Sequence, residues 1–405
     1  MVSHLRSLLR RLAAPVLTLT LLVSDAAGAN PSVDGIRLGV QANATRVVLD
    51  LTGALEYSIF TLADPYRVVV DLPEVEWRLS SSSIAAGGGL VQRLRFGLFQ
   101  PGKSRLVLDV DQPVVVTKAF MLEPTADFGH RLVLDLAPVT GEEFRRQARL
   151  APPRPAPPPR PALTPPAPPG ADDKPLIVID PGHGGVDPGT TGVSGVFEKT
   201  ITLAWAQELA RQLEVTGRYR VVLTRKRDVF VRLRRRIEIA RDHRAGVFIS
   251  MHADAIANSR VRGAAVYTLS EQASDAEAAE LAAKENKADI IAGVDFSTET
   301  YDDDVATILI ELAQRETMNF SAQFANLLVT ELGKEIRLLR KSRRFAGFRV
   351  LKAPDVPSVL VELGYLSNRD DERRLRDPAQ RQRLMRAAVR AIDRYFADRK
   401  SASRT

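Results

Sequence analysis

Four residues in separate parts of the chain have side chains suited to metal-assisted hydrolysis: His183, Glu198, His252 and Glu362. Two imidazoles and one carboxylate are typical ligands of a catalytic zinc ion, which keeps a fourth position open for water. A second carboxylate can accept the proton of that water. The combination predicts a hydrolase with one zinc ion per catalytic domain.

The rarity of histidine and the absence of cysteine strengthen this prediction. The chain has five histidines, and two of them fall in the short segments Asp180–Asp187 and Ser250–Asp254. Cysteine is absent, which excludes thiolate zinc sites, disulfides and cysteine nucleophiles. Any metal ion must be held by nitrogen and oxygen atoms.

The positions of the two histidines follow from an alternation of strand and helix patterns. Strand patterns cover 176–180, 219–224 and 247–251, and helical patterns cover 200–215 and 231–243. This alternation predicts an α/β domain with a largely parallel sheet flanked by helices. His183 and His252 then follow the carboxyl ends of strands, where open α/β sheets bind their ligands.

The glycine-rich turn Gly182–Gly185 lets the backbone leave its strand sharply and turn His183 toward the crevice. Phosphate binding by this turn is disfavoured, because no Lys-Ser or Lys-Thr pair follows it as in a P-loop.

The carboxylates have ordinary alternative roles. Glu198 begins a predicted helix, where the helix dipole favours a negative charge. Glu362 ends the apolar strand pattern 358–362, where burial would raise its pKa and suit it to proton transfer, although an arginine salt bridge is the alternative. Asp254 is a candidate ligand or an orienting group beside His252. Asn368 is predicted to cap the last helix.

The sequence predicts a leader, a linker and a catalytic domain, in addition to the N-terminal domain described below. Residues 1–29 combine arginines, a short apolar run and small residues, as in a cleaved secretory signal, and leave the export route open. No transmembrane segment is expected after its removal. Residues 139–174 are predicted to be a linker, since eleven of the twenty residues from Ala151 to Gly170 are proline. The catalytic domain is predicted to span 175–398.

The chain carries a net charge of +8, which fits anionic wall polymers outside the cytoplasm. Nucleic acid is not an expected partner, since no basic and aromatic stripe is evident. The arginine-rich run 232–236 lies on a predicted helix and is interpreted as a solvated face.

Residues 30–138 contain one motif four times, an arginine followed by apolar residues and an aspartate. The copies are Arg46–Leu51, Arg67–Leu72, Arg105–Val110 and Arg131–Leu136. Such short runs are typical of strands in a small all-β sandwich. The region resembles the AMIN domain of periplasmic amidases, which implies a targeting module that binds peptidoglycan or septal components.

From about residue 175 to 396 the chain resembles the zinc-dependent N-acetylmuramoyl-L-alanine amidases of the amidase-3 type, close to periplasmic cell-division amidases. The resemblance rests on the motifs at 179–189, 248–254 and 357–368 together with Glu198. It implies that His183, Glu198 and His252 bind zinc and that Glu362 is catalytic. It further implies cleavage of the amide between N-acetylmuramic acid and L-alanine in septal peptidoglycan.

Two other functions remain open at this stage. The same metal chemistry would serve a zinc carboxypeptidase or endopeptidase that cuts the stem peptide. A non-catalytic protein that binds and regulates the wall is the alternative outside enzymes.

Residues 271–318 interrupt the strand and helix alternation. Ser274 and Glu277 form a capping-box pattern and Gly293 a stop, which predicts one helix over 275–292. Glu285 falls in the middle of its apolar face and needs a cationic partner, either a neighbouring arginine or the metal ion. In related division amidases an inserted helix places a glutamate on the zinc until a LytM-type activator removes it, so Glu285 is the predicted autoinhibitory metal contact.

Overall fold

The computed structural model describes residues 30–79, 87–149, 174–294 and 307–402. The predicted leader and the proline-rich run lie outside these residues. No helix within the described ranges is long and apolar enough to cross a membrane.

The N-terminal domain is built almost entirely from β-strands. Its elements are β1 Ser32–Gln41, β2 Ala44–Leu51, β3 Ser58–Leu62, β4 Arg67–Pro73, β5 Glu76–Trp77, β6 Val91–Gln100, β7 Lys103–Val110, β8 Val114–Leu122, β9 His130–Pro138 and α1 Gly141–Arg149. The strands form two sheets, with orders β5-β1-β2-β9-β8 and β3-β4-β7-β6. Both sheets contribute to one apolar core, for example through Leu49 and Leu134 of the first and Val70 and Leu106 of the second. The predicted all-β sandwich is confirmed.

The fourfold motif explains how these strands pair. Antiparallel pairing of β2 with β9 sets Arg46 opposite Asp135, and pairing of β4 with β7 sets Asp71 opposite Arg105. The Arg46 and Asp135 side chains lie 2.7 Å apart, and those of Arg105 and Asp71 lie 2.6 Å apart. Because each motif begins with a cation and ends near an anion, antiparallel pairing in this register joins opposite charges.

Helix α1 lies within the segment that was predicted to be linker. Its Phe144 is fully buried and meets the ring of Tyr66 edge to face, with ring centroids 4.9 Å apart. The first residues after the last strand therefore pack against the β domain before the proline-rich run begins.

The C-terminal domain has a six-stranded sheet with the order β11-β10-β12-β15-β13-β14. Its strands are β10 Leu176–Pro181, β11 Arg220–Leu223, β12 Val247–His252, β13 Ala264–Leu269, β14 Leu338–Ala346 and β15 Ser358–Glu362. Strands β11, β10, β12 and β15 are parallel, and β13 joins β15 in the antiparallel direction. The predicted α/β fold with a largely parallel sheet is confirmed.

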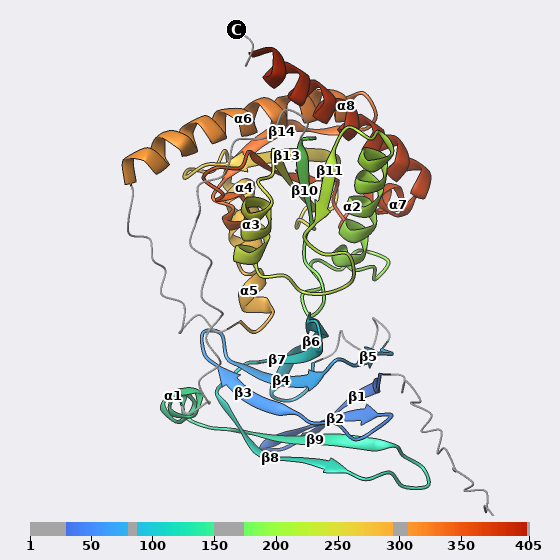
Figure 1. Ribbon diagram of the computed structural model, residues 1–405. Helices are drawn as coiled ribbons and strands as arrows, with labels where there is room; N and C mark the ends of the chain where they lie inside the picture. Colours follow the sequence, from blue (N-terminus) through green and yellow to red (C-terminus); the bar gives the residue numbers. More distant parts are fainter. Residues whose placement is uncertain (1–29, 80–86, 150–173, 295–306, 403–405) are drawn as a thin grey trace, which may run out of the picture. The chain divides into compact units, whose positions relative to one another are not determined.

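Helices cover both faces of this sheet (Figure 1). The helical elements of this domain are α2 Glu198–Val215, α3 Leu233–Asp242, α4 Ala276–Glu285, α5 Ala288–Ile291, α6 Thr307–Gly333, the 3-10 turn η2 Arg349–Leu351, α7 Arg369–Arg376 and α8 Pro378–Ala402. Ile177 and Ile179 pack on the side of α2, α6 and α8, whereas Val178 faces the core formed with α3 and α4. The alternation of side chains along β10 thus fills two separate cores.

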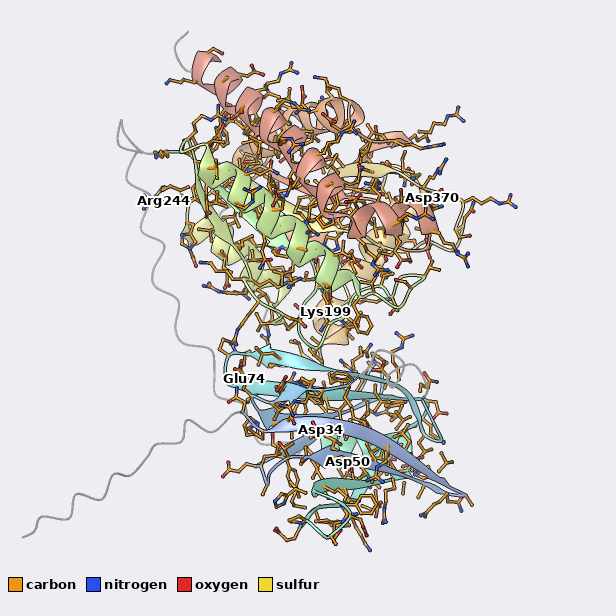
Figure 2. The ribbon with its side chains drawn as sticks, turned by 90° about the vertical axis from the view of Figure 1, so that its right-hand side faces the viewer. Asp34, Asp50, Glu74, Lys199, Arg244 and Asp370 are labelled. Carbon is orange, nitrogen blue, oxygen red and sulfur yellow. The ribbon has the colours of Figure 1, made fainter. Side chains whose placement is uncertain are left out.

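Charged side chains surround these cores. Figure 2 shows Arg244 and Asp370 at the surface of the C-terminal domain, where both are exposed.

Asn368 caps α7 by accepting hydrogen bonds from the backbone N–H groups of Asp370 and Asp371. The prediction that it caps the last helix is wrong by one helix, since α8 follows.

The segment predicted to be one helix over 275–292 is broken. Helix α4 ends at Glu285, and the short helix α5 begins at Ala288. The side chain of Asn286 stabilises the interruption between α4 and α5. Its amide donates to the Gly347 carbonyl at 2.9 Å and accepts from the Arg349 N–H at 2.7 Å. The cap is also shifted by one residue, since Asp275 accepts from the Ala278 N–H at 2.9 Å.

Candidate metal centre

The sheet brings the four motif residues to one edge. His252 and Glu362 are the last residues of the parallel neighbours β12 and β15 and lie opposite each other in register. His183 follows the end of β10, and Glu198 is the first residue of α2. The loop between β10 and α2 therefore returns Glu198 to the strand ends that carry the histidines.

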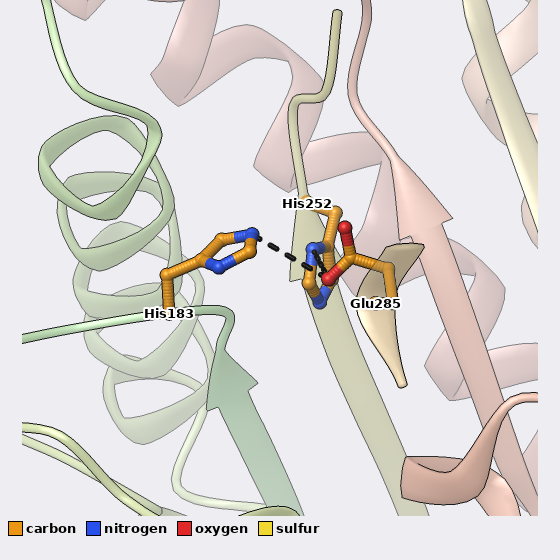
Figure 3. Close-up of side chains that lie close together, drawn as sticks. All are labelled: His183, His252 and Glu285. Carbon is orange, nitrogen blue, oxygen red and sulfur yellow. Dashed lines mark ion pairs between the residues drawn. The ribbon is translucent and has the colours of Figure 1, made fainter. Parts of the chain in front are cut away.

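Two histidine nitrogens and two carboxylates meet there. His183 Nε2 lies 3.1 Å from Glu198 Oε2 and 3.5 Å from Glu285 Oε2. His252 Nδ1 lies 3.3 Å from Glu198 Oε1 and 3.2 Å from Glu285 Oε2. Figure 3 shows Glu285 pointing at both imidazoles. The nitrogens and Glu285 offer ligand atoms within 4.8 Å of one another, as a bound metal ion requires.

The hydrogen bonding of the histidines favours a cation-binding site. Within the described residues, His183 Nε2 and His252 Nδ1 are buried and have no hydrogen-bond partner. Buried polar atoms are normally paired, so two unpaired nitrogens facing carboxylates indicate a ligand site. Burial by itself would lower the pKa of His183, but Glu198, Asp187 and Glu285 raise it well above the usual range. The surrounding carboxylates thus favour a positive charge at this position.

His183 is held in its orientation by neighbours that the sequence analysis did not assign. Its Nδ1 lies 2.9 Å from Asp187 Oδ2, which leaves Nε2 to face the centre of the site. Its backbone is left-handed, with φ of 60°, and its carbonyl accepts from Arg236 Nη2 at 2.9 Å. A carboxylate on the outer nitrogen fixes the tautomer of a metal-binding histidine.

Arg236 corrects the interpretation of the arginine-rich run as a solvated face. It is only 2% exposed, and its Nη1 lies 2.7 Å from Asp180 Oδ1. This buried ion pair ties helix α3 to the end of β10, directly before the histidine turn. Arg234 and Arg235 of the same run are exposed, as predicted.

Two glycines leave room for the side chains of the candidate ligands. A Cβ atom on Gly182 would lie 2.6 Å from His252 Nε2, and one on Gly189 would lie 2.8 Å from Glu198 Oε2. Gly189 also has φ of +67°, which disfavours other residues. These glycines are required by the packing of the site as well as by the turn.

Glu198 is completely buried, and its surroundings favour the ionised form. Its Oε1 accepts from the Ala253 N–H at 2.9 Å, and its Oε2 accepts from the Thr190 N–H at 3.0 Å. Burial raises the pKa of this carboxyl, but the nearby imidazoles of His183 and His252 outweigh burial and hold the pKa well below its usual range. Glu198 therefore contributes a negative charge to the site.

Glu362 has the opposite properties. It is also fully buried, and burial together with the charges of Asp254 and Glu198 raises its pKa well above the usual range. Its Oε2 accepts from the Asp254 N–H at 3.1 Å, while Oε1 has no partner among the described residues. Two glutamates in one site with pKa values shifted in opposite directions suit different roles, a ligand and a proton carrier.

Asp254 faces Thr190 and Lys284 rather than the histidine nitrogens. Its Oδ1 accepts from the Thr190 hydroxyl at 2.6 Å and forms a short ion pair with Lys284 Nζ. Lys284 was not singled out from the sequence, because a lysine on a helix is usually solvated. Its neighbour Glu285 was singled out from the sequence. Glu285 is 5% exposed, and it is paired with the two histidines instead of an arginine.

Helix α4 is anchored at its other end. Arg344 Nη2 lies 2.7 Å from Asp275 Oδ1 and 2.8 Å from Glu277 Oε2. Glu277 therefore pairs with β14 instead of completing the predicted capping box.

The fold and the site together define an amide hydrolase preceded by a small β domain. Residues 177–394 match the family of N-acetylmuramoyl-L-alanine amidases, and residues 35–136 match the AMIN domain. The chain is 33% identical over 385 residues to the amidase AmiC of Escherichia coli O6:H1, with 90% of each chain covered. It is 34% identical over 410 residues to AmiC of Neisseria meningitidis serogroup B, covering 96% of this chain and 97% of the relative.

This chain belongs to the N-acetylmuramoyl-L-alanine amidase family and has an AMIN domain. It is an enzyme whose substrate is peptidoglycan. The solved structure of AmiC2 of Nostoc punctiforme covers 56% of this chain and 98% of its own, with 29% identity and a TM-score of 0.40.

Proposed function

We propose that this amidase binds one zinc ion through His183, Glu198 and His252 and uses Glu362 to carry protons during hydrolysis. The observation that carries the proposal is the pair of buried, unpartnered nitrogens, His183 Nε2 and His252 Nδ1, which face carboxylate oxygens. Two histidine nitrogens and one carboxylate oxygen match the ligand set of catalytic zinc. The contacts of Asp254 with Thr190 and Lys284 support a role for Asp254 outside that ligand set.

A zinc ion bound there would polarise the substrate carbonyl and lower the pKa of water. Glu362 accepts a proton at Oε1, the oxygen without a partner, and later gives it to the leaving nitrogen. Its raised pKa suits both steps, since the group must gain and lose a proton near neutral pH. The Asp254 N–H holds the other oxygen and so fixes the orientation of the carboxyl group.

We further propose that Glu285 keeps the enzyme inactive by occupying the position that water or substrate would take. The support is its contact with both histidines and the anchoring of α4 by Arg344. Activation then requires α4 to leave, and the resemblance to division amidases makes a LytM-type protein the proposed activator. The AMIN domain and the AmiC relatives support a periplasmic location, and enrichment at the division septum is part of the same proposal.

Mass spectrometry of digested peptidoglycan tests the reaction. The protein with Glu285→Ala should release intact stem peptides with a free L-alanine amino group and leave lactyl carboxylates on the glycan. Trimmed peptides that remain on muramic acid would instead show a peptidase. Absence of any release, with the variant folded and metal-loaded, would favour a wall-binding protein.

A further inference from the structure

Two adjacent residues at the end of α4 place opposite charges at neighbouring positions in the site. The Glu285 carboxylate faces the nitrogens of His183 and His252 at 3.5 Å and 3.2 Å. The Lys284 ammonium donates to the Thr190 hydroxyl at 2.7 Å and forms a short ion pair with Asp254. The inserted helix therefore presents one carboxylate and one ammonium.

Hydrolysis of the substrate amide produces the same two groups. Water adds its oxygen to the acyl carbon, and the bond between that carbon and the L-alanine nitrogen breaks. The lactyl group becomes a carboxylate, and the two protons of the water end on the leaving nitrogen, which already carries one hydrogen, to give an ammonium. No other reactant is needed for the balance.

We propose that Lys284 and Glu285 together mimic the two products, and that Asp254 and Thr190 form the subsite for the amino group of the released L-alanine. Lys284 occupies this subsite in the closed enzyme. The inference rests on the proposed function, because it assigns the carboxylate position to the candidate metal centre.

The position of Asp254 relative to Glu362 supports this assignment. The Asp254 N–H donates to Glu362 Oε2 at 3.1 Å, so the residue that gives its proton to the leaving nitrogen lies beside the subsite. The Thr190 N–H donates to Glu198 Oε2 at 3.0 Å, so the loop that carries the subsite also holds a candidate ligand. A released amine would therefore find its acceptors next to the groups that cleave the bond.

The buried carboxylate of Asp254 also favours a cationic partner in the subsite. Asp254 is 2% exposed and Thr190 is 8% exposed, and Asp254 Oδ1 also accepts from the Ala255 N–H at 2.6 Å. When α4 leaves, Lys284 leaves with it, and a buried carboxylate without a cationic partner is unfavourable. An incoming ammonium would replace the missing charge.

The test compares two peptides on one protein, the full chain with Lys284→Met and Glu285→Ala. The probes are the stem tripeptide with its free α-amino group and the same peptide after N-acetylation, and calorimetry gives their dissociation constants. We expect the free amine to bind at least ~10-fold more tightly, which corresponds to ~1.4 kcal/mol. Because both peptides bind to the same protein, any residual closure by α4 affects both dissociation constants equally and does not change their ratio.

The subsite variants complete the test. Adding Asp254→Asn should bring the dissociation constants of the two peptides to within ~2-fold of each other, because an amide lacks the charge that attracts the ammonium. Adding Thr190→Val should reduce the ratio without abolishing it, and this variant decides the matter if Asp254→Asn does not fold. A ratio near one before these changes, or an unchanged ratio after them, would overturn the proposal.

Basal activity gives a second measurement. Lys284→Met in the otherwise unchanged chain should raise the release of stem peptides roughly 3-fold, since the loss of a partly exposed ion pair weakens the closed state only modestly. Lys287→Met is the matched control, because Lys287 is an exposed lysine three residues further along. Equal rates in the two variants would contradict occupancy of the subsite by Lys284. Failure of the opened enzyme to release stem peptides at all would instead contradict the proposed function.

Discussion

Glu285 Oε2 lies 3.2 Å from His252 Nδ1, so a carboxylate of the inserted segment occupies the space beside a candidate metal ligand. This contact links the proposed regulatory helix to the candidate metal centre. The helix that carries Glu285 is fixed at its start by Arg344 and at its end by the side chain of Asn286. Both anchors hold the Glu285 carboxylate beside the histidines. Substitution of Glu285 should therefore change the activity.

Substitution of Glu285 should activate the enzyme without an activator. We expect Glu285→Ala to raise the basal release of stem peptides at least ~10-fold, the effect of losing ~1.4 kcal/mol of preference for the closed state. Glu280→Ala is the matched control, since Glu280 is exposed on the same helix. Equal basal rates in wild type and Glu285→Ala would show that this glutamate is only structural.

Substitution of Glu362 should remove the chemistry and keep the metal. Glu362→Gln preserves the shape of the side chain but cannot accept a proton, so the rate of the opened enzyme should fall at least ~10²- to 10⁴-fold. Metal analysis and the unfolding midpoint should match the parent protein. Loss of metal in this variant would place Glu362 in the ligand shell instead.

The pH profile should reflect the raised pKa of Glu362. Burial and neighbouring carboxylates favour its protonated form, and a general base acts only when deprotonated. Activity of the Glu285→Ala enzyme should therefore increase with pH, with a midpoint above the usual glutamate value of ~4.3. A rate that is already maximal at pH 4 and remains flat at higher pH would contradict this role.

Much of the candidate site was predictable because its residues follow recognisable local patterns. His183, His252 and Glu362 end or follow apolar strands, and parallel strands bring their carboxyl ends to one edge. Arg236 and Lys284 could not be recognised, because their partners Asp180 and Asp254 are distant in the sequence. A cation on a helix is usually solvated, so local sequence favours the wrong interpretation.

The interruption between α4 and α5 likewise depends on residues that are distant in the sequence. Apolar spacing correctly predicted that Ala278, Leu281 and Glu285 share a buried face. The break at Asn286 depends on hydrogen bonds with Gly347 and Arg349, more than 60 residues away. Neither glycine nor proline marks it, so the sequence alone predicts a continuous helix.

The N-terminal domain should be needed for placement and not for cleavage. A fragment beginning near Asp172 should cut soluble wall fragments as well as the full chain with the same Glu285→Ala change, because the proposed site residues all lie beyond the linker. In cells, the fragment should lose septal enrichment, whereas full-length Glu362→Gln should retain it. Unchanged localisation of the fragment would contradict this prediction.

The ion pairs of Glu331 should stabilise the packing of α6 on α8 in a pH-dependent way. Hydrogen bonds from Lys334, Arg390 and Arg394 lower its pKa from 4.5 to about 2. Since the folded pKa lies below the unfolded one, the stabilisation is present above pH 4.5 and is lost as the pH falls toward 2.

Glu331→Gln should therefore lower the free energy of unfolding at pH 7 by ~1 to 3 kcal/mol. Unfolding midpoints of the two proteins should converge as the pH is lowered. Glu316→Gln, an exposed change on the same helix, should have little effect at either pH. A gap that is independent of pH would show that the loss comes from packing alone.

The proposed zinc ion lies between the two histidines and Glu198. Metal content provides the first check: His252→Ala should lose the ion, and His243→Ala should keep one zinc per chain because His243 is exposed at the end of α3. Full metal content and activity in His252→Ala would exclude His252 as a ligand.

The most direct measurement is anomalous diffraction at the zinc edge from crystals of the full chain. We predict a single peak ~2.0 to 2.1 Å from His183 Nε2 and His252 Nδ1, and ~2.0 to 2.2 Å from oxygens of Glu198 and Glu285. A peak elsewhere in the protein, or a zinc ion at this site without Glu198 among its ligands, would contradict the account.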